Sequence, residues 1–260
     1  MLTTELLDRD AEGWTIPQRW ERFSAEEHRV WDLLFARQTE LLAGRAVAAF
    51  EEGIAALGLD ASGIPDFTRL NARLFPRTGW SVVSVPGLIP DAAFFDLLSR
   101  RVFPAGNFIR SAGSLDYLEE PDVFHDVFGH VPLLADAKVA DFMALLGRLG
   151  LEVIGQGALH RLSRLYWHTV EFGLAREGGE LKVFGAGIAS SFGETKRALG
   201  AALPRPSFDL ERVMRTAYRS DAMQPGYVVV EDVAAMLAEV SGADLPALYR
   251  RMAREADLEL

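Results

Sequence analysis

The sequence predicts a mainly α-helical protein with a few short β-strands, folded as one large domain. Apolar residues recur at helical spacing along most of the 260-residue chain, and capping, glycine and proline signals divide them into segments. The runs rich in β-branched residues are short, and they do not alternate with helices as in a doubly wound sheet. With 49% hydrophobic residues, the chain is long enough to bury a core without disulfides or a structural metal.

The N-terminal part of the chain predicts a polar extension followed by helix. Residues 1–20 are polar and mixed, so we expect an N-terminal extension there and the main domain over 21–260. Ser24 and Glu27 have the spacing of a capping box, which marks a helix start. One long helix, or two in line, is expected to run to Leu57, where Gly58 ends it.

The middle of the chain predicts alternating helices and short strands. A helix is expected to begin near Pro65 and to end before Pro76, because proline suits a first turn but breaks a helix interior. Trp80 to Val85 is predicted to be a strand, 90–101 a helix and 107–110 a short strand. The remaining predictions are strands at 181–184 and 227–230 and helices at 120–130, 136–153, 157–176, 191–201, 209–219, 231–241 and 244–257.

Charge and cysteine content exclude several classes of function. A net charge of −10 repels phosphate backbones and anionic lipids, so neither nucleic acid nor a membrane surface is an expected partner. The chain has no cysteine, so any metal must be held by nitrogen and oxygen atoms. The sequence shows no signal-peptide pattern, no apolar run of about 18 residues and no C-terminal heptads. We therefore expect a cytoplasmic monomer.

Two of the five histidines, His125 and His130, lie five positions apart. On a regular α-helix a five-residue step turns by about 140°, so the two rings could not face one ligand. We therefore expect the helix to end or distort between them, near Gly129 and Pro132. The spacing also differs from that of zinc proteases, whose paired histidines are four residues apart.

A metal site built on these histidines needs a carboxylate. Two imidazoles and one carboxylate on one side of an octahedron leave three open positions, which suits Fe(II), although the residues alone leave zinc, manganese and cobalt open. Glu171 lies in an apolar helical stretch one turn after Trp167, and it could instead pair with Arg164 or Arg176. The nearer candidates are Glu119, Glu120, Asp122 and Asp126.

Three segments together resemble a known family. The runs EEPDVFHDVFGHVPLL (119–134), LYWHTVEFGL (165–174) and VFGAGIASSFGE (183–194) resemble the pterin-dependent aromatic amino acid hydroxylases in order and spacing. The likeness is greatest to the small bacterial phenylalanine hydroxylases, and it covers 14–194 and continues more weakly to about 227. It implies the single-domain catalytic fold of that family, with 21–260 as the catalytic domain.

The resemblance assigns roles to individual residues. It implies that His125, His130 and Glu171 bind iron and that Ser190 supports a ligand histidine, although Ser190 could also cap the following helix. It implies that Arg110 grips the carboxylate of the amino acid substrate and that Asp122 holds this arginine. The residues expected around the substrate ring are Pro121, Trp167 and Phe172.

The resemblance also implies a pterin site upstream of the histidines. Phe94 is expected to stack on the pterin ring, although the neighbouring Phe95 is an alternative. Asp126 stands where the family often has glutamate, and we expect it to contact the pterin through water. Backbone groups of three consecutive residues are expected at the pterin edge: Gly87, Leu88 and Ile89.

The implied activity is hydroxylation of L-phenylalanine to L-tyrosine with dioxygen, Fe(II) and a tetrahydropterin such as tetrahydrobiopterin. One alternative is a family member that acts on tryptophan or tyrosine, which initial rates on the three amino acids would distinguish. A second is a zinc metallohydrolase that uses the same ligands, and a third is a non-catalytic metal-binding regulator. Metal analysis and pterin-dependent oxygen uptake separate these classes.

Overall fold

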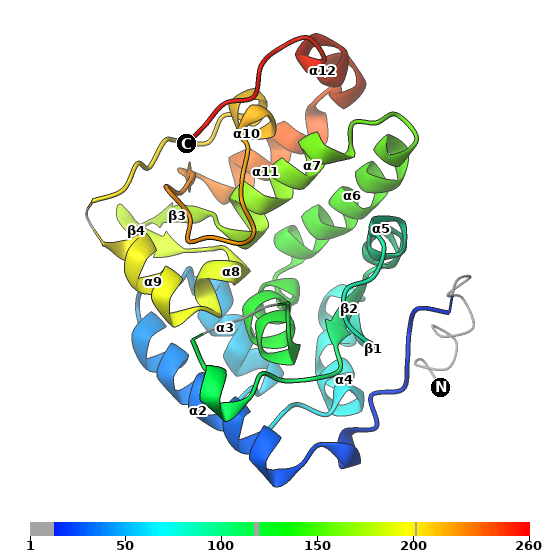
Figure 1. Ribbon diagram of the computed structural model, residues 1–260, viewed down its shortest axis with the longest axis vertical. Coiled ribbons are helices and arrows are strands. Elements are labelled where there is room, and N and C mark those ends of the chain that lie inside the picture. The colour runs from blue at the N-terminus through cyan, green and yellow to red at the C-terminus, as the bar shows by residue number, and fades with distance from the viewer. Residues whose placement is uncertain (1–12, 117–119, 201) are drawn as a thin grey trace.

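The computed structural model describes residues 13–116, 120–200 and 202–260, and it confirms the mainly helical fold with short strands (Figure 1). In the N-terminal half the helical segments are η1 Trp20–Arg22, α2 Ala25–Leu42, α3 Ala48–Leu57, α4 Phe67–Thr78, α5 Asp91–Ser99 and η2 Ala112–Ser114. In the second half they are η3 Phe124–His130, η4 Val131–Ala135, α6 Ala137–Ile154, α7 Leu159–Tyr166, η5 Trp167–Glu171, α8 Ala186–Ala189, α9 Phe192–Leu199, α10 Leu210–Arg215, α11 Val233–Gly242 and α12 Leu245–Met252.

The strands form two small sheets. In the first sheet, β1 Ser81–Val85 pairs in parallel with β2 Val102–Gly106. The second has the order β4-β3-β5, with β3 Leu174–Glu177 antiparallel to β4 Glu180–Val183 and parallel to β5 Val229–Val230. In Figure 1 both sheets lie beside helices, and neither forms a central layer of the fold.

The predicted helix start at Ser24 is confirmed. The Ser24 hydroxyl accepts the Glu27 amide at 3.2 Å, and the Glu27 carboxylate accepts the Ser24 amide at 2.7 Å. The segment that follows is two helices, because the chain leaves α2 after Leu42 and re-enters helix at Ala48. Gly58 caps α3 in the left-handed conformation, as predicted.

Several predicted boundaries are wrong. Helix α4 runs through Pro76 to Thr78: Pro76 costs one hydrogen bond of the last turn, and Gly79 still closes that turn by donating its amide to the Phe75 carbonyl at 2.9 Å. The strand expected at 107–110 is instead Val102–Gly106, where Pro104 is tolerated because each strand of a two-stranded sheet is an edge strand. The predicted helix 157–176 ends at Glu171, because Phe172 leaves the helical conformation with φ −127° and residues 174–177 pair as strand β3 with β4 and β5.

Other predicted helices are shorter than expected. The segment predicted at 120–130 becomes regular only at Phe124, and the helices predicted at 209–219 and 244–257 end at Arg215 and Met252. The four-residue helix α8 was not predicted. Residues 1–12 of the predicted extension and position 201 of the predicted helix 191–201 lie outside the described residues.

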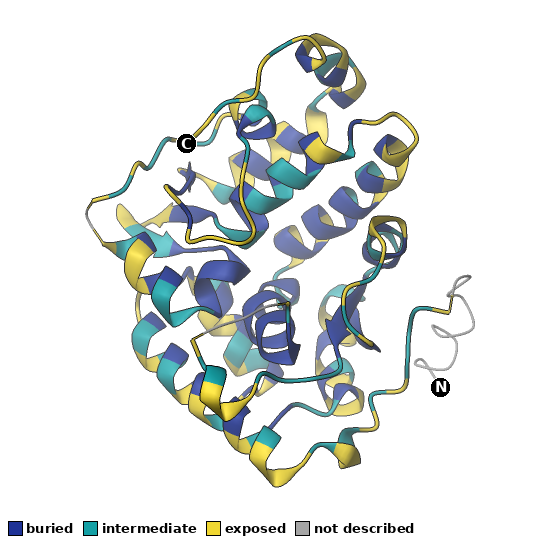
Figure 2. Ribbon diagram, in the orientation of Figure 1, coloured by how far each residue is buried: buried dark blue, intermediate teal, exposed yellow. Residues whose placement is uncertain are grey.

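Figure 2 shows buried and exposed residues along the ribbon, and most of the buried residues are apolar. All seven residues of η3 are buried, so the segment that carries both histidines lies in the interior of the fold. None of the described helices is both long enough and apolar enough to span a lipid bilayer.

Helices α5 and α6 approach each other closely at Gly147 of α6. A Cβ atom on Gly147 would lie 2.3 Å from the backbone nitrogen of Ser99, a distance that no real Cβ contact tolerates. We expect Gly147→Ala to lower the free energy of unfolding by about 2–3 kcal/mol, since overpacking forces the backbones apart. Urea unfolding of the metal-free protein measures this. Gly155→Ala is the control, because its Cβ would meet nothing within 4 Å, and equal losses in both variants would contradict the prediction.

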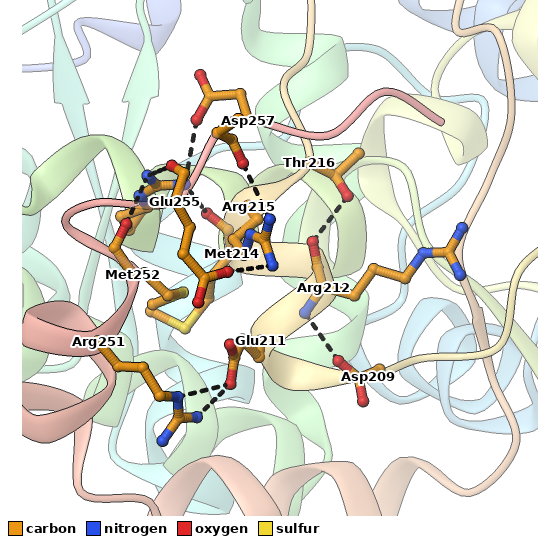
Figure 3. A network of polar contacts seen from close by, with 12 residues as sticks. Asp209, Glu211, Arg212, Met214, Arg215, Thr216, Arg251, Met252, Glu255 and Asp257 are labelled. Carbon is orange, nitrogen blue, oxygen red and sulfur yellow. Dashed lines mark hydrogen bonds and ion pairs between the residues drawn. The ribbon is translucent and has the colours of Figure 1, made fainter.

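The C-terminal segment folds back on α10 and α7 through a polar network (Figure 3). The Asp257 carboxylate binds Arg161 at 3.1 Å and Arg164 at 2.6 Å. Next to it, the Leu258 amide donates to the Arg215 carbonyl at 2.9 Å, and the Ala217 amide donates to the Leu258 carbonyl at 2.8 Å. These contacts fix the chain immediately after α10.

Hydrogen bonding to Arg164 lowers the pKa of Asp257 to about 2, and this predicts an acid sensitivity. A carboxylate whose folded-state pKa is depressed stabilises the fold above its unfolded pKa of about 3.9, and this stability is lost as the pH falls towards 2. The carboxylate is half exposed, so we expect Asp257→Asn to cost only about 1 kcal/mol at pH 7. Thermal unfolding between pH 7 and pH 3 measures the difference in stability between the unmodified protein and the variant. We expect this difference to become smaller at low pH. The same difference in stability at every pH would contradict the lowered pKa of Asp257.

Candidate metal centre and substrate cavity

Segment η3 is a π-helix, and this conformation brings the two histidines together. A π-helix closes hydrogen bonds between residues five apart, so such residues lie one above the other. The Nε2 atoms of His125 and His130 are 3.3 Å apart. The predicted distortion is therefore confirmed, but it extends through Gly129. Glycine is required there because a Cβ would lie 2.9 Å from the Ala186 carbonyl oxygen.

Glu171 ends the second π-helix, η5, and its carboxylate meets both imidazoles. Its Oε1 lies 3.0 Å from His130 Nε2, and its Oε2 lies 3.6 Å from His125 Nε2. Among the described residues these three form the one group of His, Asp or Glu side chains arranged to hold a metal ion, with all ligand atoms within 4.8 Å of one another. The histidine pair and the distant glutamate thus converge at one point.

The other partners that the sequence left open for Glu171 are engaged elsewhere. Arg164 pairs with Asp257, and Arg176 pairs with Glu231 at 3.1 Å. The nearer acids also have other environments: Asp122 pairs with Arg110, Asp126 accepts the Gly106 amide at 2.8 Å, Glu120 is exposed, and Glu119 lies outside the described residues.

The hydrogen bonds of Ser190 define which nitrogen of His125 is protonated. The Ser190 hydroxyl donates its hydrogen to the Ala186 carbonyl at 2.8 Å. Its oxygen therefore accepts from His125 Nδ1, which lies 2.8 Å away, and the unprotonated Nε2 faces Glu171 and His130. The helix cap considered for Ser190 is instead provided by Ser191, whose hydroxyl accepts the Glu194 amide.

The charge states of His125 and Glu171 suit metal binding, whereas the Glu171 carboxylate raises the pKa of His130 despite its burial, so a bound metal ion would replace a proton at that ring. Burial lowers the pKa of His125 to about 4, so its ring is neutral at pH 7. Burial alone would raise the pKa of Glu171, but His130 and His125 outweigh it and hold that pKa below its usual value. A neutral imidazole and an ionised carboxylate are the forms that coordinate metals.

The cluster lies in the wall of a cavity of about 310 Å³. Several residues assigned by resemblance also line this cavity: Pro121, Trp167, Gly87, Leu88, Ile89, Phe94 and Asp126. Both Phe94 and Phe95 line it, but Phe94 is the more exposed of the two. Burial raises the pKa of Asp126 to about 7.

The remaining assigned residues, Arg110, Asp122 and Phe172, are not among those that line this cavity. Arg110 and Asp122 form a buried two-point ion pair, with Nε–Oδ2 at 2.8 Å and Nη2–Oδ1 at 2.9 Å. Asp122 also accepts the His125 amide at 3.0 Å, so this pair is joined directly to the metal cluster. The Phe172 ring packs on Trp167 with centroids 4.6 Å apart.

Sequence reasoning missed several cavity residues. Tyr166 and Phe103 line the cavity beside His130, with ring centroids 6.3 and 5.0 Å from its ring. Tyr166 directly precedes Trp167 in a motif already singled out, so its place could have been inferred. Tyr218 lies in the loop after α10, within the segment 209–219 that the sequence predicted to be helical, and no sequence signal pointed to its place in the cavity.

The fold and the three-ligand cluster define a candidate metal centre in the wall of a largely apolar cavity. The family of biopterin-dependent aromatic amino acid hydroxylases matches residues 11–243, and this chain belongs to that family. A phenylalanine-4-hydroxylase of Caulobacter vibrioides is 52% identical over 94% of this chain and 83% of the relative. A second, from Chromobacterium violaceum, is 46% identical over 95% of this chain and 83% of the relative.

Solved structures agree with this assignment. A Chromobacterium violaceum phenylalanine hydroxylase with bound oxidised Fe(III) has a TM-score of 0.92 and 45% identity, covering 96% of this chain and 91% of the other. A structure of the same protein with iron(III) and 7,8-dihydrobiopterin has a TM-score of 0.90 and 45% identity, with 96% and 90% coverage. The iron- and phenylalanine-bound form has a TM-score of 0.91 and 42% identity, with 100% and 96% coverage.

Proposed function

We propose that this protein is an iron-dependent phenylalanine 4-monooxygenase, which converts L-phenylalanine to L-tyrosine with dioxygen and a tetrahydropterin. The observation that carries the proposal is the convergence of His125, His130 and Glu171 in the wall of the cavity. The relatives of known name at 52% and 46% identity support phenylalanine as the substrate.

The donor set fits Fe(II). Two imidazole nitrogens and one carboxylate are the ligands of non-haem iron oxygenases, and they leave coordination positions open. His125 Nε2, His130 Nε2 and a Glu171 oxygen would hold the ion, and the Ser190 hydroxyl keeps the His125 ring in the required tautomer. Iron, when bound, supplies the activation of dioxygen that amino acid side chains cannot provide.

The cavity also fits a reduced pterin. Phe94 offers a partly exposed aromatic ring, and Asp126 offers a polar group in the same cavity. Within the described part of the chain, the backbone groups of 87–89 make no hydrogen bond to other protein atoms, so they are free to pair with a ligand. We assign the pterin to this side of the cavity.

The remaining side chains orient the amino acid. Arg110, held in a fixed plane by Asp122, is the cation for the substrate carboxylate, and a planar guanidinium fixes orientation as well as affinity. Trp167 and Pro121 line the cavity where the substrate ring would lie, and Phe172 supports the Trp167 ring from behind.

The domain bounds, location and partners of the protein are assigned from its sequence. We assign the catalytic domain to 21–260 and an N-terminal extension to 1–20. The sequence pattern supports a cytoplasmic monomer, and a net charge of −10 opposes nucleic acid and membrane binding, so we expect small molecules as its partners.

Product identification tests the proposed activity. The purified protein is loaded with one equivalent of Fe(II) and incubated with phenylalanine, tetrahydrobiopterin and oxygen, and the products are separated by liquid chromatography. We expect tyrosine, none without pterin and none with zinc in place of iron. Turnover of tryptophan or tyrosine at a higher kcat/KM than phenylalanine would contradict the substrate assignment, and pterin-independent hydrolysis would contradict the reaction class.

A further inference from the structure

The loop between α10 and β5 contacts the π-helix η5 at three points. His168 Nε2 donates to the Thr216 carbonyl at 3.0 Å, and Trp167 Nε1 donates to Gln224 Oε1 at 3.0 Å. The Tyr218 ring stacks on the Trp167 indole, with centroids 4.2 Å apart and planes 13° from parallel. We call residues 216–224 the Trp167 clamp.

Both ends of the Trp167 clamp are fixed. At its start, the Ala217 amide donates to the Leu258 carbonyl at 2.8 Å. At its end Gln224 is buried, and its backbone amide donates to Glu194 Oε1 at 3.0 Å. The Gln224 side chain also donates to two carbonyls of the clamp itself, at 3.0 Å each. Tyr218 is therefore held in place by its backbone as well as by its ring contact.

Trp167 and Tyr218 both line the cavity that holds the metal cluster. Tyr218 is 37% exposed, so it stands at the rim. Within the described residues its hydroxyl makes no hydrogen bond, so the contact that it contributes is made by the ring face. Stacked aromatic rings attract one another beyond simple burial of their area.

We propose that Tyr218 is a positioning residue that selects the substrate ring by size, because it holds the Trp167 indole in one plane. The hydrogen bond to Gln224 fixes one edge of the indole, and the stacked Tyr218 ring fixes its tilt. Together they set the width of the slot between Trp167 and the rest of the cavity wall. This inference rests on the proposed function, since it concerns how the same site admits an aromatic amino acid.

The test replaces Tyr218 in the iron-loaded protein. Calorimetric titration of phenylalanine without pterin and without oxygen gives Kd, and steady-state rates give KM and kcat. For Tyr218→Ala we expect Kd and KM to rise about five-fold, with kcat changed less than two-fold. We also expect the kcat/KM ratio of tryptophan to phenylalanine to increase, because a mobile indole admits the larger ring.

Two further variants make the test specific. Tyr218→Phe keeps the ring and is expected to recover phenylalanine binding. Phe75→Ala removes an aromatic side chain of similar exposure, 39%, that does not line the cavity, and it is expected to leave Kd and KM unchanged. Thermal unfolding of each variant shows that the fold is retained.

Unchanged Kd and amino acid preference in Tyr218→Ala would overturn the inference. So would Tyr218→Phe binding as weakly as Tyr218→Ala, since the hydroxyl would then be the important group. Failure of the proposed function has a different signature: the unmodified protein itself would form no tyrosine.

Discussion

Replacing Glu171 with alanine is expected to abolish turnover and to leave the protein unable to retain iron. The carboxylate lies 3.0 Å from His130 Nε2 and is the one anionic donor of the cluster. Two neutral imidazoles alone neither neutralise the charge of Fe(II) nor complete the face of three ligands. We expect iron affinity to fall at least about 100-fold and kcat to fall at least about 1000-fold.

Metal analysis after anaerobic loading and desalting measures the iron content, and tyrosine formation measures turnover. Glu231→Ala provides the control, since it removes an exposed carboxylate that pairs with Arg176 outside the cavity. Near-stoichiometric iron and full activity in Glu171→Ala would contradict the ligand assignment.

Replacing Arg110 with alanine is expected to impair both substrate binding and stability. The guanidinium is the partner of Asp122, whose side chain is fully buried. Arg110 holds the pKa of Asp122 below its usual value even though burial would raise it. Removing the arginine leaves this charge unpaired in the interior, which costs about 3–5 kcal/mol. We therefore expect a lower thermal midpoint in addition to a KM for phenylalanine that rises by about two orders of magnitude.

Arg110→Lys separates the two effects. Lysine keeps the positive charge beside Asp122 but loses the planar fork, so we expect a smaller loss of stability with a KM that remains high. Calorimetric unfolding and steady-state rates on both variants measure the two quantities. A normal KM in Arg110→Lys would show that charge alone, and not the fork, binds the substrate carboxylate.

The sequence predicted the metal centre more fully than the boundaries of the helices. The five-residue step from His125 to His130 required a distorted helix, and the structure meets this requirement with a π-helix. The sequence could not show which distortion would occur, because Gly129 permits either a helix end or the close approach of α8. The link from Glu171 to this pair came from the family motifs and not from spacing.

The elements that sequence reasoning missed depend on contacts between distant segments. Strand β2 is displaced from its predicted position because Val102–Gly106 pairs with β1, and strand pairing is not a local property. Tyr218 enters the cavity because Leu258 and Gln224 hold the loop at either end. The periodicity of this segment predicted a helix to 219 and did not indicate these distant contacts.

The most direct test of the central claim is a crystal structure of the iron-loaded protein, with anomalous diffraction recorded at the iron edge. The account predicts one peak at about 2.0–2.2 Å from His125 Nε2, His130 Nε2 and a Glu171 carboxylate oxygen, with its remaining positions open to the cavity. A peak that excludes Glu171, or one with a fourth protein side chain in the open positions, would contradict it.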